Sequence, residues 1–157
     1  MNVPQWLEPV LRVGLWLCRP KYLVGVFPVC IDADERVLLI KKRLGAATGW
    51  QLPGGAKEYG VSLEASACRE LYEETGLEAM EKDLRFIDIQ ILERYRDVQV
   101  SYLVTRWKGV ASPRDTTEIE AAQWVPIRKA LSILYVPHQP ILESALRQWY
   151  RCGLAMP

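Results

Sequence analysis

The chain has 157 residues, of which half are hydrophobic and a quarter are charged, as is usual for a globular protein of one domain. Its formal net charge of +1 gives no reason to expect a stable nucleic-acid partner or a strongly anionic membrane. No stretch of about 18 uncharged apolar residues occurs, so a transmembrane helix is not expected.

Residues 1–20 predict an amphipathic helix. Apolar residues recur there at helical spacing, namely Val3, Trp6, Leu7, Val10, Leu11, Gly14 and Leu17. We expect this helix to pack on the rest of the protein. Contribution to a homodimer interface and contact with a membrane surface are the alternatives, because tryptophans such as Trp6 and Trp16 are costly to leave in water.

The next part of the chain predicts two strands. Residues 22–32 form a nearly unbroken apolar run, and residues 37–43 follow a turn at Asp32–Arg36, which is typical of a β-hairpin. The basic end of this hairpin, Lys41, Lys42 and Arg43, is a candidate for phosphate contact, although such strand ends are usually only solvated. Trp50, in the connection at 44–51, is expected in the core, with contact to a bound base as the alternative.

The stretch from Leu52 to Leu77 carries the clearest chemical signal. It opens with Gly54 and Gly55, where the backbone can approach a ligand closely because no Cβ is present. A helix follows, with an apolar arc of Leu63, Ala67 and Leu71 that fits half-burial against a core. The glycine after this helix, Gly76, is expected to adopt the left-handed conformation of a helix cap.

Three glutamates lie on one side of this predicted helix. At about 3.6 residues per turn, Glu70, Glu73 and Glu74 project within an arc of roughly 100°. A solvated acidic face, eased by Arg69, would explain them alone. Next to a glycine loop, however, these hard oxygen ligands indicate Mg²⁺ or Mn²⁺ bound together with phosphate.

The rest of the chain predicts further strands and two helices. Residues 84–93 and 98–107 read as strands joined across Arg94–Asp97, and the first alternates well enough for a sheet with one buried face. A loop at 108–119, a strand at 121–127 and helices at 127–134 and 140–151 follow. The fold class is therefore α/β, with helices packed on a mixed sheet.

The stretch from residue 55 to 77 resembles the Nudix box, G-x5-E-x7-R-E-U-x-E-E-x-G-U, in which U is aliphatic. The matching residues are Gly55, Arg69, Glu70, Leu71, Glu73, Glu74, Gly76 and Leu77. The resemblance implies a Nudix-like α/β/α sandwich with a mixed β-sheet over 21–157, with the helix at 1–20 as an addition. One position departs, because Val61 stands where the box has its first glutamate. That glutamate usually pairs with the box arginine, so Arg69 is left to pair with Glu73 or Glu58.

The resemblance also implies an activity. A Nudix enzyme cleaves the phosphoanhydride of a nucleoside diphosphate linked to another moiety, such as a (d)NTP, ADP-ribose or a nucleotide sugar. It uses Mg²⁺, for which Mn²⁺ can substitute, to neutralise phosphate charge and activate a water. By this carry-over Glu70 and Glu74 are the expected metal ligands, with Glu73 as a further ligand or water partner, a backbone carbonyl at Gly54 or Gly55, and Arg69 orienting the carboxylates.

The general base stays open at this stage. A box glutamate, Glu70 or Glu73, is one choice, and Glu118, Glu120 and Glu93 are candidates outside the box, each of which is more often an ordinary solvated carboxylate. A base must reach the attacking water within hydrogen-bond distance, which spacing alone does not show. The only histidine, His138, lies in a loop-like stretch and is expected to be incidental.

Two other functions compete with hydrolysis. The absence of a glutamate at Val61 favours a nucleotide-binding module with weak turnover, and the segment at 1–20 favours an interaction protein. The cysteines, Cys18, Cys30, Cys68 and Cys152, show no CxxC pairing and are expected as free, mostly buried thiols. That pattern predicts a cytoplasmic location.

Overall fold

The structure is a computed structural model that describes residues 8–9, 12–13, 21–43 and 49–153. Most of the predicted helix at 1–20 lies outside these residues, so that prediction is not tested. The elements in chain order are β1 (Leu23–Cys30), β2 (Arg36–Lys42), β3 (Gly49–Gln51), β4 (Gly55–Ala56), α2 (Leu63–Thr75), η1 (Glu81–Asp83), β5 (Leu84–Leu92), η2 (Glu93–Tyr95), β6 (Asp97–Val104), β7 (Ile119–Pro126), α3 (Ile127–Ile133), η3 (Val136–His138) and α4 (Gln139–Arg151).

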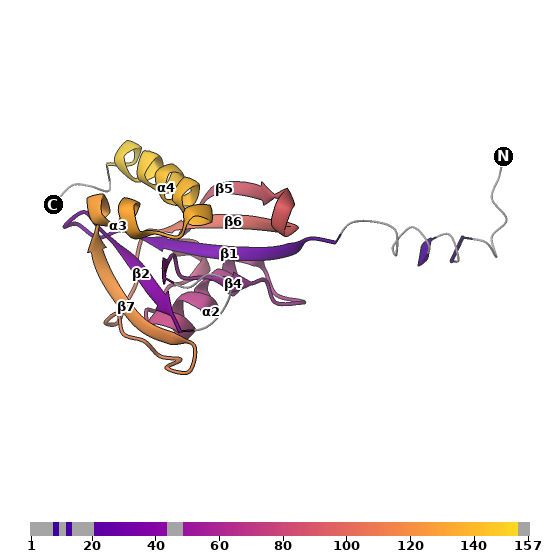
Figure 1. Ribbon diagram of the computed structural model, residues 1–157, viewed down its shortest axis with the longest axis horizontal. Helices are drawn as coiled ribbons and strands as arrows, with labels where there is room; N and C mark the ends of the chain where they lie inside the picture. Colours follow the sequence, from indigo (N-terminus) through magenta and orange to yellow (C-terminus); the bar gives the residue numbers. More distant parts are fainter. Residues whose placement is uncertain (1–7, 10–11, 14–20, 44–48, 154–157) are drawn as a thin grey trace.

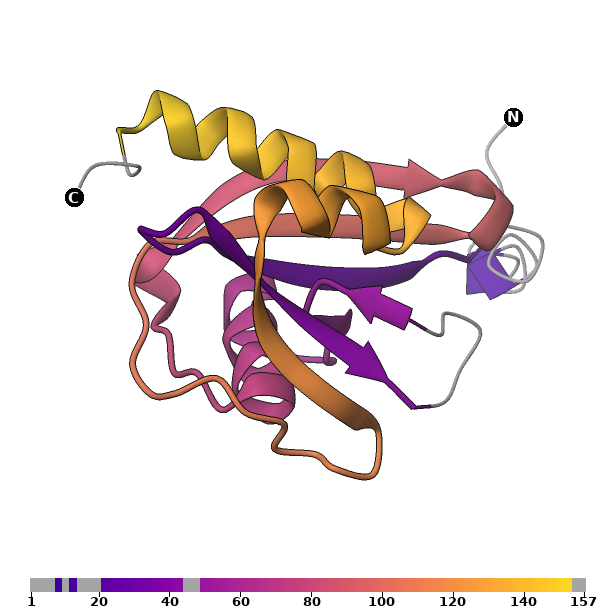
Figure 2. The same cartoon turned by 60° about the vertical axis from the view of Figure 1, so that its left-hand side comes forward.

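Within the described residues the strands form two sheets. One has the order β4-β1-β6-β5 and is mixed, because β1 and β6 run parallel while the other neighbours are antiparallel. The other is antiparallel, with the order β3-β2-β7. Helix α2 lies on one side of the strands and α3 and α4 on the other (Figures 1 and 2). The expected mixed sheet between helices is therefore confirmed, and the second sheet is an addition to it.

The predicted hairpin of β1 and β2 is wrong. After the turn at 32–36 the two strands share one isolated bridge, Ile31 with Val37, and then separate into different sheets (Figure 2). Both strands are buried over most of their length, and such a strand needs a neighbour on each edge as well as a layer on each face. Strand β1 has β4 and β6 as its neighbours and β2 has β3 and β7, so the two strands do not pair with one another along their length.

The largest core cluster lies between the sheets and the helices α3 and α4. Helix α4 contributes Ile141, Leu142, Ala145 and Trp149, all at most 2% exposed. Trp50 is partly buried against the same cluster, as expected for a core residue. On the opposite side, Ala67 and Leu71 of α2 are fully buried, which confirms the apolar arc of that helix.

Strand β5 departs from the expected single buried face. Its pairing with β6 shifts between Phe86 and Asp88, and such a bulge reverses which residues share a face. Phe86, Ile89 and Ile91 are consequently more than half exposed.

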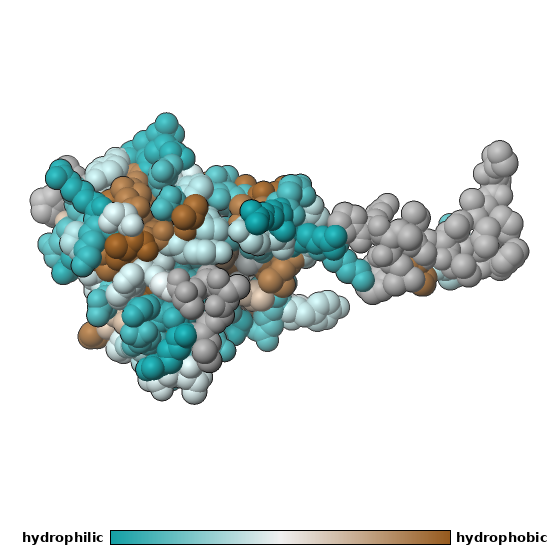
Figure 3. Space-filling model, in the orientation of Figure 1, coloured by the Kyte–Doolittle hydropathy of each residue, from teal (hydrophilic) through white to brown (hydrophobic). Residues whose placement is uncertain are grey.

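On the face of the molecule seen in Figure 3, apolar patches interrupt a mostly hydrophilic surface. Among the described residues no helix is long and apolar enough to cross a membrane.

Candidate active site

Helix α2 presents the three glutamates because both of its ends are fixed. Its N-terminal cap is Ser62, whose hydroxyl accepts a hydrogen bond from the Ala65 amide at 3.0 Å, an arrangement worth about 1 kcal/mol. At the other end Gly76 has φ 73° and donates its N–H to the Tyr72 carbonyl, which confirms the predicted cap. The helix register between these points fixes the direction of each glutamate.

Glu74 is the most deeply buried of the three, with 6% exposure. Its Oε2 accepts a hydrogen bond from the Gly54 N–H at 2.7 Å, and its Oε1 lies 2.9 Å from the Nζ of Lys42. Burial raises the pKa of this carboxyl to about 7, although the ammonium of Lys42 and the Gly54 amide both act to lower it. Glu74 is thus a carboxylate whose charge the protein only partly compensates.

The glycine loop packs directly against this acidic face. A Cβ on Gly55 would lie 2.5 Å from Oε2 of Glu70, and a Cβ on Gly54 would collide with the carbonyl oxygen of Val26. Gly54 also has φ 147°, a conformation that other residues rarely adopt. Burial raises the pKa of Glu70 as well, with the charge of Arg69 opposing the shift. The loop therefore brings backbone close to two partly desolvated carboxylates.

Arg69 connects the remaining acids. Its guanidinium contacts Oε1 of Glu70 at 2.7 Å and Oε2 of Glu73 at 2.6 Å, and its Nε lies 3.2 Å from Oε2 of Glu58. Both pairings expected from the missing glutamate at Val61 are thus present. The buried Nε nevertheless has no hydrogen-bond acceptor among the described residues, so its contact with Glu58 is an ion pair without a hydrogen bond. One donor of the box arginine is therefore unsatisfied.

The predicted metal ligands all lie in this region, namely Gly54, Gly55, Glu70, Glu73 and Glu74. The three glutamate side chains do not form a closed cage. Among the described residues, no three acidic, histidine or cysteine side chains gather closely enough to hold an ion. Glu73 turns to Arg69 and its side chain is half exposed. Mg²⁺ usually takes only one or two protein carboxylates and completes its shell with water and substrate phosphate, so the oxygen donors present suit it.

The acids predicted outside the box are not brought into contact with the box glutamates. Glu120 pairs with Lys41 at 2.9 Å, and Glu118 is exposed and accepts the Arg43 amide through its backbone carbonyl. Glu93 accepts a hydrogen bond from the hydroxyl of Tyr22. At the end of β2 the Lys42 side chain contacts a box glutamate, Glu74. The side chains of Lys41 and Arg43 contact Glu120 and the Thr116 carbonyl instead.

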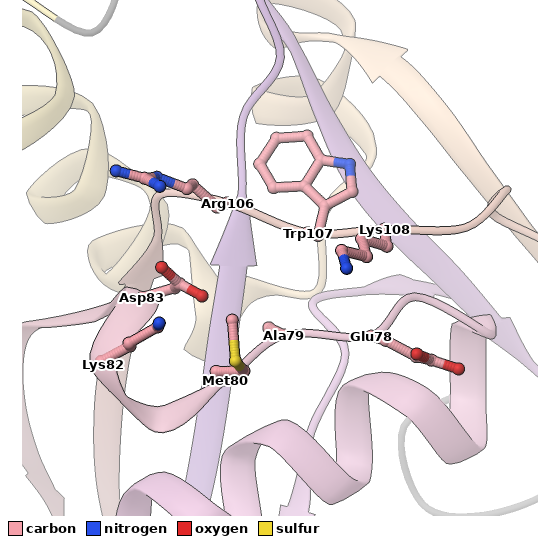
Figure 4. Close-up of a pocket in the computed structure, with 8 residues that line it drawn as sticks. All are labelled: Glu78, Ala79, Met80, Lys82, Asp83, Arg106, Trp107 and Lys108. Carbon is pink, nitrogen blue, oxygen red and sulfur yellow. The ribbon is translucent and has the colours of Figure 1, made fainter.

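A separate hollow of about 390 Å³ lies beyond the C-terminal end of α2 (Figure 4). Two chain segments line it, and the Trp107 ring beside it stacks on Trp124 with 5.4 Å between ring centroids. None of its lining residues was predicted as a site residue. They are Glu78, Ala79, Met80, Lys82, Asp83, Arg106, Trp107 and Lys108.

The chain is similar to known proteins over most of its length. The family model described as NUDIX domain matches residues 21–148. The chain belongs to the Nudix family. A Bacillus subtilis protein with the provisional name 8-oxo-dGTP diphosphatase is 30% identical over 118 residues, covering 75% of each chain. An RNA pyrophosphohydrolase of Rhodopseudomonas palustris is 26% identical over 128 residues, covering 69% of this chain and 73% of the relative.

A solved Nudix structure has the same fold. The MutT Nudix hydrolase of Burkholderia pseudomallei superimposes with a TM-score of 0.67 at 25% identity, covering 79% of this chain and 98% of that one. Together with the relatives named as pyrophosphohydrolases or diphosphatases, this makes the chain a Nudix-type hydrolase. The residues that match the Nudix box lie on α2 and on the glycine loop before it.

Proposed function

We propose that this Nudix hydrolase is a metal-dependent nucleotide pyrophosphohydrolase that splits the phosphoanhydride of a nucleoside diphosphate linked to another moiety. The observation that carries the proposal is the buried carboxylate of Glu74, held by Gly54 and paired with Lys42. A buried acid with a pKa near 7, beside a loop open to close approach, is typical of a functional site.

Glu70 and Glu74 would hold the metal, with a carbonyl of Gly54 or Gly55 and, as a further ligand or water partner, Glu73. When bound, Mg²⁺ supplies neutralisation of phosphate charge and a more acidic water. The residues fit such an ion because their donors are hard oxygens and because the raised pKa of Glu74 reflects incompletely compensated burial. A divalent cation would compensate it more fully than one ammonium does.

The protein's own side chains have separate tasks in this proposal. Arg69 orients Glu70 and Glu73 through its two short contacts, and the Gly54 N–H fixes the rotamer of Glu74. Lys42 neutralises Glu74 in this structure and would be available to a substrate phosphate if a divalent ion took over that role. Glu73 is the proposed base, because it lies beside the proposed ligands Glu70 and Glu74 on α2 and its side chain is half exposed, so that it can reach a water.

The first substrates to consider are those that the relatives' names give. We infer a nucleoside triphosphate such as 8-oxo-dGTP as the leading class, with the 5′-triphosphate end of RNA, ADP-ribose and nucleotide sugars behind it. The free thiols at Cys30, Cys68 and Cys152 support a reducing, cytoplasmic location. Assembly as a homodimer through residues 1–20 stays a prediction.

A substrate panel tests the proposal. The full chain is incubated with 8-oxo-dGTP, dGTP, triphosphorylated RNA, ADP-ribose and a nucleotide sugar, with Mg²⁺, Mn²⁺ or a chelator, and release of phosphate, pyrophosphate and nucleoside monophosphate is measured. Turnover that the chelator abolishes is the expected result. A thermal shift by a nucleotide without any turnover would replace the proposal with a nucleotide-binding module, for which the departure at Val61 would be the reason.

A further inference from the structure

His138 is a buried side chain, with 4% exposure, at the junction of η3 and α4. Its ring lies edge-on to Phe27, with 4.7 Å between ring centroids, and to Tyr135 at 5.4 Å. Its Nδ1 accepts a hydrogen bond from the backbone N–H of Leu52 at 3.2 Å. Since Nδ1 is the acceptor, the ring is neutral and carries its proton on Nε2.

The hydrogen bond to Leu52 extends a short contact between residues 50–52 and 134–138, two segments that are far apart in the sequence. Leu134 forms a parallel bridge with Trp50, and the Tyr135 N–H donates to the Trp50 carbonyl at 2.8 Å. Two residues after Trp50 comes Leu52, which is 1% exposed and whose backbone N–H needs an acceptor. A buried amide without an acceptor costs about 1–3 kcal/mol, and the imidazole supplies that acceptor where the facing backbone does not.

The contact between residues 50–52 and 134–138 lies next to the glycine loop. Leu52 precedes Gly54 by two residues, and the Gly54 N–H is the group that holds Glu74 at 2.7 Å. The ring of Phe27, which contacts His138, also lies against Gly54, where a Cβ would come within 2.7 Å of it. His138 therefore reaches the loop in two ways, through the hydrogen bond to Leu52 and through the packed ring of Phe27.

We propose that His138 is a positioning residue that fixes the backbone of the Leu52–Gly55 loop and thereby the metal-binding arrangement of Glu74. The metal part of this inference rests on the proposed function, whereas the hydrogen bond and the order of the loop do not. Burial and the charge of Lys42 lower the pKa of His138 to about 4, so the ring keeps its acceptor at neutral pH. His138 touches no reacting atom and is not a catalytic residue.

Two substitutions of nearly equal shape separate the acceptor from the volume. In His138→Asn the side-chain oxygen can occupy the position of Nδ1 and accept the Leu52 amide, whereas His138→Leu has a similar branched shape without an acceptor. Amide hydrogen exchange of Leu52 and Gly54 is measured by NMR on the metal-free protein. We expect exchange at both amides to be about 10-fold faster in His138→Leu, the equivalent of losing one hydrogen bond, and within about threefold of wild type in His138→Asn.

The second readout is metal use. The Mn²⁺ concentration for half-maximal hydrolysis should rise about 10-fold in His138→Leu, as for other residues that support a metal ligand, and should return in His138→Asn. Leu142→Ala is the control, because Leu142 is fully buried in the same core cluster as Leu52 but its aliphatic side chain supplies no hydrogen-bond acceptor. It should lower Tm without changing exchange at Leu52 relative to the global rate.

The outcomes separate this inference from the proposed function. Unchanged exchange at Leu52 and Gly54 in His138→Leu overturns the positioning role, as does an equal change in Leu142→Ala. Absence of turnover by the wild-type chain on every nucleotide, with faster exchange in His138→Leu and rescue by His138→Asn, keeps the positioning of the loop and refutes hydrolysis instead.

Discussion

The ammonium of Lys42, at the end of β2, lies 2.9 Å from the buried carboxylate of Glu74, near the end of α2. This contact joins the antiparallel sheet to the box helix at the point where the glycine loop begins. It also places a monovalent cation on the carboxylate that is proposed to bind a divalent one. Several properties of the protein should therefore depend on this pair.

Substitution of Glu74 by glutamine should abolish most of the metal-dependent activity without unfolding the protein. The amide oxygen can still accept the Gly54 N–H, but the negative charge that attracts a divalent cation is lost. We expect kcat/KM to fall by at least about 100-fold, with Tm unchanged or higher because a partly desolvated charge is removed. Glu64→Gln, on the same helix but bonded to the Tyr102 hydroxyl, is the control, and a wild-type rate in Glu74→Gln would show that the site is misplaced.

Replacement of Lys42 by methionine should destabilise the metal-free protein in a pH-dependent way. At pH 8 it leaves the Glu74 carboxylate buried and unpaired, which should cost about 3 kcal/mol. At pH 6 Glu74 can take up a proton, and the cost should be nearer 1 kcal/mol. Urea unfolding at both pH values measures the difference. Lys41→Met, which breaks only the exposed pair with Glu120, should cost under about 0.5 kcal/mol at either pH; equal losses in the two variants would contradict the prediction.

Val61→Glu should restore a partner for Arg69. Val61 is partly exposed, so a carboxylate can be accommodated, and the buried Nε of Arg69 lacks an acceptor among the described residues. We expect activity equal to or up to about 10-fold above wild type and a gain of about 1 kcal/mol in unfolding free energy. Val61→Gln, without the charge, should gain less. A large loss of activity would mean that the Val61 side chain has a packing role that outweighs the missing pair.

The pH dependence of stability should contain two opposed contributions. The pKa of Glu74 is raised from 4.5 to about 7 in the folded state, so its contribution is complete below pH 4.5 and is lost as pH rises through about 7. The pKa of His138 is lowered from 6.5 to about 4, so its contribution is complete above pH 6.5 and is lost as pH falls through about 4. Each is worth up to about 3 kcal/mol.

Single variants should uncover each contribution. In Glu74→Gln the His138 contribution remains, so the unfolding free energy should fall more steeply than in wild type as pH drops from 6.5 towards 4. In His138→Asn the Glu74 contribution remains, so the free energy should fall more steeply as pH rises from 4.5 to 7. Chemical unfolding across pH 4–8 gives the unfolding free energy of each variant and of wild type, and their difference gives both slopes. Variant and wild-type free energies that change in parallel with pH would refute the assignment.

The sequence by itself determined the chemical part of the site. The glycines, the helix, its cap at Gly76 and the three glutamates lie within about 25 neighbouring positions, and the helical repeat fixes which of them share a face. Local periodicity is sufficient there because the spacing between the groups is set by one continuous backbone. The same holds for α4, which the sequence predicts at 140–151 and the structure has at Gln139–Arg151.

Only the tertiary structure decided how that site is supported. Local periodicity does not encode the ion pair of Lys42 with Glu74 or the hydrogen bond from Leu52 to His138. It also does not encode the separation of β1 and β2 into different sheets. The burial of His138 is not predicted from the sequence, because a single histidine in a loop-like stretch belongs to no periodic pattern. The exposure of β5 likewise depends on a bulge in its pairing with β6. Contacts of this kind depend on which surfaces remain to be covered once the elements pack together.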